Sequence, residues 1–248
     1  MLGFDPAAHA LRVMWSASVG DYITALDVDS TGELLALGTD SGEVCVFDVT
    51  SSALRTRVTV HDGGVLSAKW SPTQRLLATS GQDGSLRLQD SDGNERCRQP
   101  SSRWIERLAW SPDGTRLAAA SGSVVRIFDA EGRAMLATET HPGTVTGLAW
   151  NRRGNQFASA CLDGVRIFHG DSPTRSRGLR WRVPLVSLSW SPNDAIIAAV
   201  TEANTVHFWR LPSGRDAEIA GFPARPRALA WDPASHFLAT SGDAKVAV

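Results

Sequence analysis

The sequence predicts an all-β protein built from one repeated unit of short antiparallel strands. The first observation is that an aromatic residue recurs about every 40 residues at the end of a similar segment. The second is that short alternating apolar runs are separated by turn-forming residues at the roughly 8–12-residue spacing typical of strands. The third is that no segment has the period of about 3.6 residues that an amphipathic helix requires.

The first strand of each unit ends at the recurring tryptophan. Five copies, VLSAKW, IERLAW, VTGLAW, LVSLSW and PRALAW, end at Trp70, Trp110, Trp150, Trp190 and Trp231. Their spacings are 40, 40, 40 and 41 residues, and an earlier copy, ITALDV, places Val28 at the same position 42 residues before Trp70. The sequence therefore contains six copies, five complete and a sixth that is partial.

The second and third strands follow in the same order in each copy. A turn with Pro, Asp or Gly precedes the apolar runs LLALGT, LLATSG, LAAASG, FASACL, IIAAVT and FLATSG. A tight turn, often with Asp and Gly, then leads into the alternating runs VCVFD, LRLQD, VVRIFD, VRIFH and VHFWR. Alternation with β-branched residues predicts antiparallel strands.

A unit of about 40–45 residues with three or four strands resembles the WD40 repeat of β-propellers. The resemblance covers about residues 11–248. The Trp-Asp pair that names the family is degenerate here, and its positions read Phe47-Asp48, Gln89-Asp90, Phe128-Asp129, Phe168-His169 and Trp209-Arg210. The family's His, nine residues before the tryptophan, is present only as His61 and His141. The equivalent residues of the other copies are Val19, Ser101, Trp181 and Phe222.

The resemblance implies a ring of radially packed sheets, because one four-stranded sheet cannot bury both of its faces alone. Small residues of the second strand would allow close packing near the central channel: Ala78, Ala118, Ala158 and Ala198. The resemblance also implies a buried hydrogen-bond network that ties a loop to the sheet. Its members would be His61 with Asp83 and His141 with Asp163.

We expect a single propeller domain over residues 1–248. Its repeats would be about 21–62, 63–102, 103–142, 143–182, 183–223 and a partial 224–248, after an N-terminal closing strand within 1–20. Two rings are open. In one, this is a fragment or a C-terminally truncated chain of a seven-bladed ring. In the other, Leu11–Val19 closes a six-bladed ring. We favour the first, because the sequence stops within the third strand of the last copy.

The composition of the chain disfavours some classes of function, among them nucleic-acid coat proteins and membrane proteins. The chain has 25 basic and 26 acidic residues and a net charge of −1, which disfavours a nucleic-acid coat. No apolar run approaches the ~20 residues that cross a bilayer, and the start does not resemble a signal peptide. Three cysteines in unrelated settings indicate reduced thiols, so we expect a cytoplasmic protein without a membrane partner. The excess of Arg over Lys is typical of a bacterial protein from a GC-rich genome.

The sequence predicts neither a metal site nor a catalytic site. None of the six histidines forms a pair with metal-ligand spacing, and no nucleophile elbow or phosphate loop is present. The Ser-Pro pairs recur in phase with the repeat, so we interpret them as turn residues. We therefore expect no enzyme activity, cofactor or small-molecule substrate.

The loops that precede the first strands differ from copy to copy, and they are the predicted protein-binding site. The resemblance places them together on one face of the ring. Aromatic and arginine side chains, which dominate binding hot spots, occur in these loops: Tyr22, Arg103, Trp104, Trp181, Arg182, Phe222 and Arg225. The alternative is that Trp104, Trp181 and Phe222 cap the apolar seams between sheets. We predict a non-catalytic scaffold that binds a protein or peptide.

Two other functions stay open. The segment 171–184 carries four arginines around Trp181 and could bind nucleic acid as an Arg-rich loop, or could simply be a solvated hairpin edge. An enzyme would require a set of histidines, carboxylates or metal ligands that points into the central channel. The sequence offers no such set.

Overall fold

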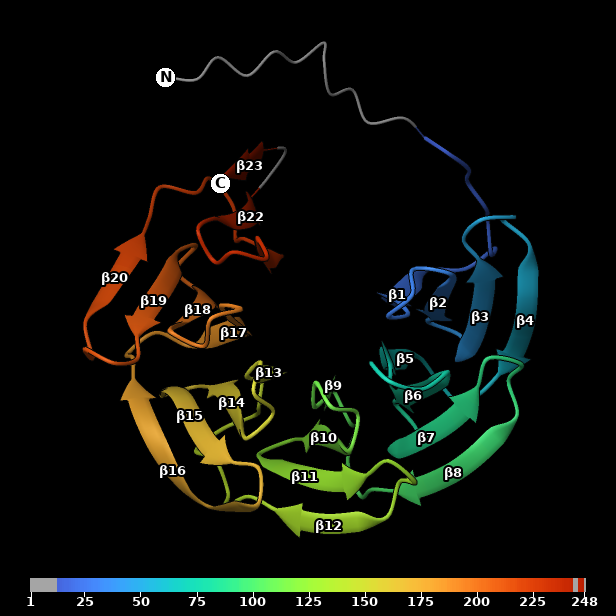
Figure 1. The fold of residues 1–248 in the computed structure, drawn as a ribbon, viewed down its shortest axis with the longest axis horizontal. Helices are drawn as coiled ribbons and strands as arrows, with labels where there is room; N and C mark the ends of the chain where they lie inside the picture. Colours follow the sequence, from blue (N-terminus) through green and yellow to red (C-terminus); the bar gives the residue numbers. More distant parts are fainter. Residues whose placement is uncertain (1–12, 243–244, 248) are drawn as a thin grey trace.

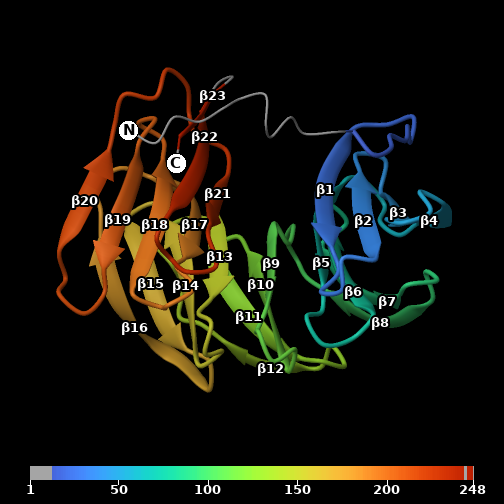
Figure 2. The same cartoon turned by 45° about the horizontal axis from the view of Figure 1, so that its top comes forward.

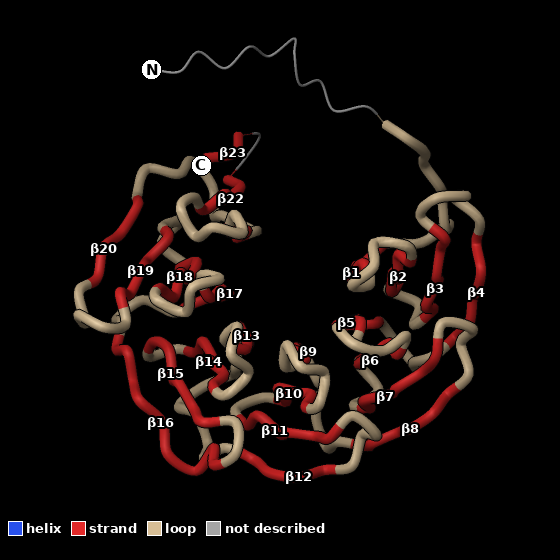
Figure 3. The backbone as a smooth tube through the Cα atoms, in the orientation of Figure 1, coloured by secondary structure: helices blue, strands red, loops and turns tan. Residues whose placement is uncertain are grey.

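The computed structural model describes residues 13–242 and 245–247, and every regular element among them is a strand. Figure 3 shows only strands and the loops that join them. The strands form five four-stranded sheets and one three-stranded sheet, each antiparallel and in chain order. Figure 1 shows the six sheets side by side around a common centre. This arrangement is a β-propeller.

Each sheet begins with an inner strand, and five of the six inner strands end at the recurring tryptophan. These first strands are β1 (Ile23–Val28), β5 (Val65–Trp70), β9 (Arg107–Trp110), β13 (Gly147–Trp150), β17 (Leu185–Trp190) and β21 (Leu229–Trp231). The second strands are β2 (Leu34–Thr39), β6 (Leu76–Gly81), β10 (Arg116–Ser121), β14 (Gln156–Cys161), β18 (Ile196–Thr201) and β22 (Leu238–Gly242).

The third and fourth strands lie progressively farther from the centre in Figure 1. The third strands are β3 (Glu43–Asp48), β7 (Ser85–Asp90), β11 (Val124–Asp129), β15 (Gly164–His169), β19 (Val206–Arg210) and β23 (Lys245–Ala247). The fourth strands are β4 (Leu54–Thr59), β8 (Glu95–Pro100), β12 (Ala134–Ala137), β16 (Ser172–Arg180) and β20 (Asp216–Ile219). These outer strands are largely exposed, as expected at the rim of a ring.

The core consists of the seams between consecutive sheets. In the first seam, Leu34 and Val44 of one sheet pack with Val65 and Leu77 of the next, and all four are fully buried. The alanines at the centre of the second strands are fully buried as well: Ala78, Ala118, Ala158 and Ala198. Alternating strands thus bury one face against the preceding sheet and the other against the following sheet.

Three of the five recurring tryptophans link their sheet to the one before it through the indole N–H, whereas the indole nitrogens of Trp70 and Trp231 have no partner. Trp110 donates to the carbonyl of Lys69 (3.0 Å), and Trp150 donates to the carbonyl of Ala109 (3.0 Å). Trp190 repeats the contact with Ala149 at 3.2 Å. The 40-residue period of the sequence therefore corresponds to a hydrogen bond between neighbouring sheets.

The first pair of sheets is joined differently. The indole nitrogen of Trp70 is buried without a hydrogen-bond partner. Asp27 replaces the missing link, since its carboxylate accepts the backbone N–H of Trp70 (2.9 Å) and the ammonium of Lys69 (2.8 Å).

The N-terminal closing strand predicted within residues 1–20 is not formed in its described part. Residues 13–20 belong to no sheet, and residues 1–12 lie outside the described residues. Instead, Trp15 packs on Phe47 with ring centroids 5.9 Å apart and donates to the carbonyl of Val49 (3.0 Å). Val19 is buried in the same cluster. This face of the first sheet has no neighbouring sheet among the described residues, so its apolar side chains draw this segment onto it.

Candidate protein-interaction face

The loops between sheets lie on the same edge of the ring as the turns between second and third strands. Backbone hydrogen bonds connect the two sets: Ser101 donates to Gly84 (2.6 Å), His141 to Ser123 (2.8 Å) and Trp181 to Asp163 (3.1 Å). We call this edge the loop face. It comprises the loops 20–22, 60–64, 101–106, 138–146, 181–184 and 220–228 with the turns 40–42, 82–84, 122–123, 162–163 and 202–205.

Glycines at the ends of these turns let the loops approach closely. Gly42 and Gly164 have φ angles of +85° and +124°, which side chains other than glycine's rarely adopt. A Cβ on Gly42 would collide with the carbonyl oxygen of His61, and one on Gly164 would collide with that of Leu179. The Asp-Gly turns therefore fix the positions of the loops.

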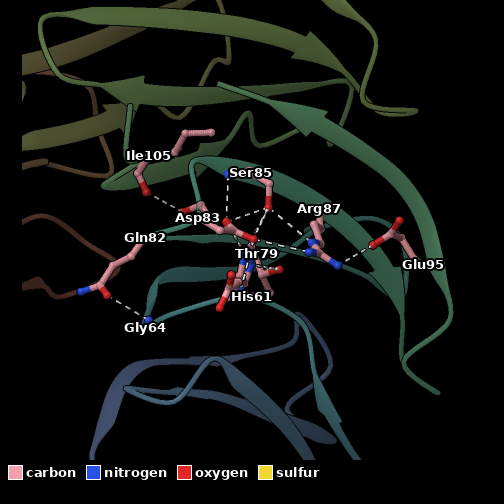
Figure 4. Close-up of polar contacts among 11 residues, drawn as sticks. His61, Gly64, Thr79, Gln82, Asp83, Ser85, Arg87, Glu95 and Ile105 are labelled. Atoms are coloured by element: carbon pink, nitrogen blue, oxygen red, sulfur yellow. Dashed lines mark hydrogen bonds and ion pairs between the residues drawn. The ribbon is translucent and has the colours of Figure 1, made fainter. Parts of the chain in front are cut away.

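His61 lies at the centre of the polar network in Figure 4 and joins a loop to β6 and β7. Its Nδ1 donates to Asp83 (3.0 Å), and its Nε2 accepts from the hydroxyl of Thr79 (3.0 Å). The hydroxyl of Ser85 donates to Asp83 (2.8 Å), and the guanidinium of Arg87 lies 3.4 Å from the same carboxylate. All polar atoms of the His61 ring are thus satisfied although the residue is buried.

The charges of this network follow from burial and hydrogen bonding. Burial alone would raise the pKa of Asp83, but the hydrogen bonds from His61 and Ser85 outweigh it and hold that pKa below its usual range. Burial lowers the pKa of His61, and the bond to Asp83 only partly offsets this. The pair therefore consists of a carboxylate and a neutral imidazole near pH 7, which is a structural arrangement.

His141 does not form the predicted pair with Asp163. Its Nδ1 donates to the carbonyl of Ser123 (2.9 Å), and its Nε2 accepts from Ser159 (2.7 Å). Asp163 instead accepts from the thiol of Cys161 (3.0 Å). The residue at position 161 explains the difference. Its counterpart Gly81 has no side chain, and the His61 ring packs directly against it, whereas Cys161 has a side chain at the equivalent position.

The structure separates the seven predicted binding residues into two groups. Tyr22 (83% exposed) and Trp104 (51% exposed) present their rings to solvent. The arginines of the set, Arg103, Arg182 and Arg225, are exposed as well.

Trp181 and Phe222 lie in seams between sheets. The Trp181 ring stacks on the buried ring of His207, with centroids 3.6 Å apart, and Trp209 meets His207 edge-on. Phe222 packs against the apolar cluster between the last two sheets. These two aromatics match the seam-capping alternative, whereas Trp104 does not.

Sequence reasoning missed the residue beneath Trp181. His207 is 1% exposed, and neither ring nitrogen forms a hydrogen bond. Its Nε2 lies 3.2 Å from a carboxylate oxygen of Asp216, but the angle does not suit a hydrogen bond. The alternation of the third strand could have revealed it, since it places His207 and Trp209 on the same face.

The Arg-rich segment 171–184 is mostly a strand rather than a loop. Residues 172–180 form β16, which pairs with β15 at the outer edge of its sheet. Arg177 donates to the carbonyl of Leu211 (3.2 Å) in the next sheet. The structure therefore has the hairpin edge that was the alternative to a nucleic-acid loop.

Across 13–242 and 245–247, no three His, Cys, Asp or Glu side chains gather in a way that could hold a metal ion. That part of the chain also contains no helix long and apolar enough to cross a bilayer.

Comparison with known proteins identifies the repeat. The family model "WD domain, G-beta repeat" matches residues 52–90, 96–129 and 134–165. These residues of the chain therefore contain WD40 repeats. The first WD40 match runs from just before β4 to the end of β7, so the family's unit begins with the outer strand of one sheet and ends within the next.

WD-repeat proteins also occur among the curated relatives. Human F-box-like/WD repeat-containing protein TBL1X is 26% identical over 218 residues, which cover 79% of this chain and 37% of that protein. The mouse Intraflagellar transport protein 80 homolog is 31% identical over 109 residues, which cover 44% of this chain and 14% of that protein. This chain thus spans well under half the length of either relative.

Proposed function

We propose that the protein is a non-catalytic scaffold that binds a protein or peptide partner on its loop face. The observation that carries the proposal is the exposure of Trp104 and Tyr22, two large aromatics at the edge where the loops are held by backbone bonds to the turns. Aromatic and arginine side chains on rigid loops lose little conformational freedom on binding, so much of their burial contributes to affinity.

The comparisons support the same class of function. Repeats of this family mainly serve as platforms for other proteins, as the resemblance in the sequence implies. The three cysteines, Cys45, Cys97 and Cys161, are free thiols, which supports our proposal of a reducing compartment such as the cytoplasm.

Affinity capture from the native organism tests the proposal. The bait is the chain with Trp104→Ala and Arg103→Ala, compared with the unchanged chain. Phe237→Ala is the matched control, because Phe237 is also an exposed aromatic (60%) but lies in the turn after β21, at the opposite edge. We expect the double variant to lose its partner and to keep its melting temperature, while the control keeps both. Equal capture by all three baits would contradict the proposal.

A further inference from the structure

A hollow on the loop face lies where the fourth sheet meets the fifth. It has a volume of about 580 Å³ and is lined by Asp163, Arg180, Trp181 and Arg182. Trp181 is held from below by its stack on His207 and along its backbone by the bond to Asp163. The wall that carries both arginines is therefore rigid.

The two arginines of the hollow have no partners within the described part of the chain. Neither Arg180 nor Arg182 forms an ion pair or a side-chain hydrogen bond there, and Arg182 is exposed. Their neighbour Arg166 differs, because it lies 3.2 Å from Glu139 and 3.5 Å from Asp163. Arg166 lies between two carboxylates and offsets the charge of one of them, so the free guanidinium groups of Arg180 and Arg182 leave this surface with a net positive charge.

An apolar group lies beside these charges. Leu162, in the same turn as Asp163, is 56% exposed. Guanidinium groups bind carboxylates through paired hydrogen bonds, and an exposed leucine favours an apolar side chain. The partner chemistry that complements this surface is therefore anionic with an apolar residue.

We propose that this hollow binds an acidic peptide segment of a protein partner, with carboxylates on Arg180 and Arg182 and an apolar residue on Leu162. The proposal rests on the proposed scaffold function and names the chemistry of the partner.

Single-stranded nucleic acid fits the surface less well. A strand needs a basic groove that follows its backbone over several nucleotides. The nearby Arg177 is already bound to the Leu211 carbonyl, so the two arginines that line the hollow do not extend into a longer basic groove.

Fluorescence anisotropy with labelled peptides tests the proposal on the whole chain. The probe is Glu-Glu-Leu-Glu-Glu-Leu, and its Lys-for-Glu counterpart is the control peptide. The variant is Arg180→Glu with Arg182→Glu. The matched control variant is Arg98→Glu with Arg175→Glu, which changes the net charge equally at exposed positions of the outer strands β8 and β16.

We expect the acidic probe to bind and the Arg180/Arg182 variant to bind it at least about tenfold more weakly. The control variant should stay within about twofold, and affinity should fall as NaCl rises from about 50 to about 500 mM. Melting curves show whether each variant is folded, and Leu162→Ser, which leaves all charges in place, should weaken binding severalfold.

Three results would overturn the proposal: no binding of the acidic probe, equal weakening in both charge variants, or tighter binding of oligodeoxythymidine that is lost in the Arg180/Arg182 variant. The scaffold function is tested separately by capture through Trp104. Partner capture that depends on Trp104 and survives the Arg180/Arg182 change would refute this inference alone.

Discussion

At the scale of single residues, the recurring tryptophan is a polar link as well as an apolar side chain. Trp150 donates to the Ala109 carbonyl in the preceding sheet, and the guanidinium of Arg116 lies 5.5 Å from its ring centroid. Trp70 occupies the same position in its own sheet, but its indole N–H has no partner. The two residues allow the hydrogen bond to be tested against a natural control.

We expect Trp150→Phe to lower the free energy of unfolding by about 1 kcal/mol more than Trp70→Phe does. Only the first change removes a made hydrogen bond, whereas the second removes an unsatisfied donor. Urea denaturation of both variants measures the difference. Equal losses would show that the indole bond contributes nothing beyond packing.

Buried histidines make stability depend on pH. Burial lowers the pKa of His61, His141 and His207 below the ordinary value of 6.5. Below pH 6.5 the unfolded chain then binds more protons than the folded one, so acid favours unfolding. The depressed pKa of Asp83 adds a further loss below pH 3.8.

We therefore expect the protein to be less stable at about pH 5.0 than at about pH 7.5. Each histidine contributes a slope of at most about 1.4 kcal/mol per pH unit. Guanidinium denaturation at the two pH values measures the difference, and it should shrink in His141→Gln. A stability that is the same at both values would show that these rings titrate normally in the fold.

At the scale of elements, the turn between second and third strands determines where the next loop lies. Gly164 shows this best, because it contacts the end of β16 at a φ of +124°. We expect Gly164→Ala to destabilise the protein by about 1–3 kcal/mol through strain and collision.

Gly178 is the control for that change, since it lies in β16 and a Cβ there would meet nothing within 4 Å. Gly178→Ala should leave the melting temperature nearly unchanged. If both variants had the same melting temperature, the turn before β15 would not determine where the next loop lies.

Much of each element could be predicted from the sequence, because its periodicity reflects the sheet. The predicted strand ends at Trp70, Trp110, Trp150, Trp190 and Trp231 are the observed ends of the first strands, and the all-β propeller is confirmed. The site was less predictable. His61 and His141 have the same spacing to their aspartates, but the side chain of Cys161 changes the partners.

The exposure of the loop aromatics also could not be read from the sequence. Trp104 and Trp181 occur in equivalent loops, and one is exposed while the other stacks on His207. That outcome depends on the next sheet, which local sequence does not describe. Whether the ring has six or seven blades stays a prediction.

At the scale of the whole molecule, the sheets form a linear series of neighbours. The first sheet and the last sheet lie at opposite ends of the arc in Figures 1 and 2. Within residues 13–242 and 245–247, each sheet between the first and the last packs against two other sheets, whereas the first and the last pack against one each. Stability in such arrays is close to a sum of nearest-neighbour contributions.

We expect the protection of a sheet against amide hydrogen exchange to depend on how many neighbouring sheets it packs against. Protection should be strongest over β9–β16 and weakest over β1–β4 and β21–β23, because a sheet with one neighbour opens more readily. Exchange measured by mass spectrometry on the whole chain gives the profile. Uniform protection along the chain would indicate that the sheets unfold as one unit.

The indole links all point the same way along the chain. In each of the three, the donor belongs to the later sheet and the carbonyl to the earlier one. A ribosome releases the acceptor first, so β9, β13 and β17 each emerge with an indole donor for a sheet that has already left the tunnel. Assembly during translation can then proceed one sheet at a time, without waiting for the far end of the chain.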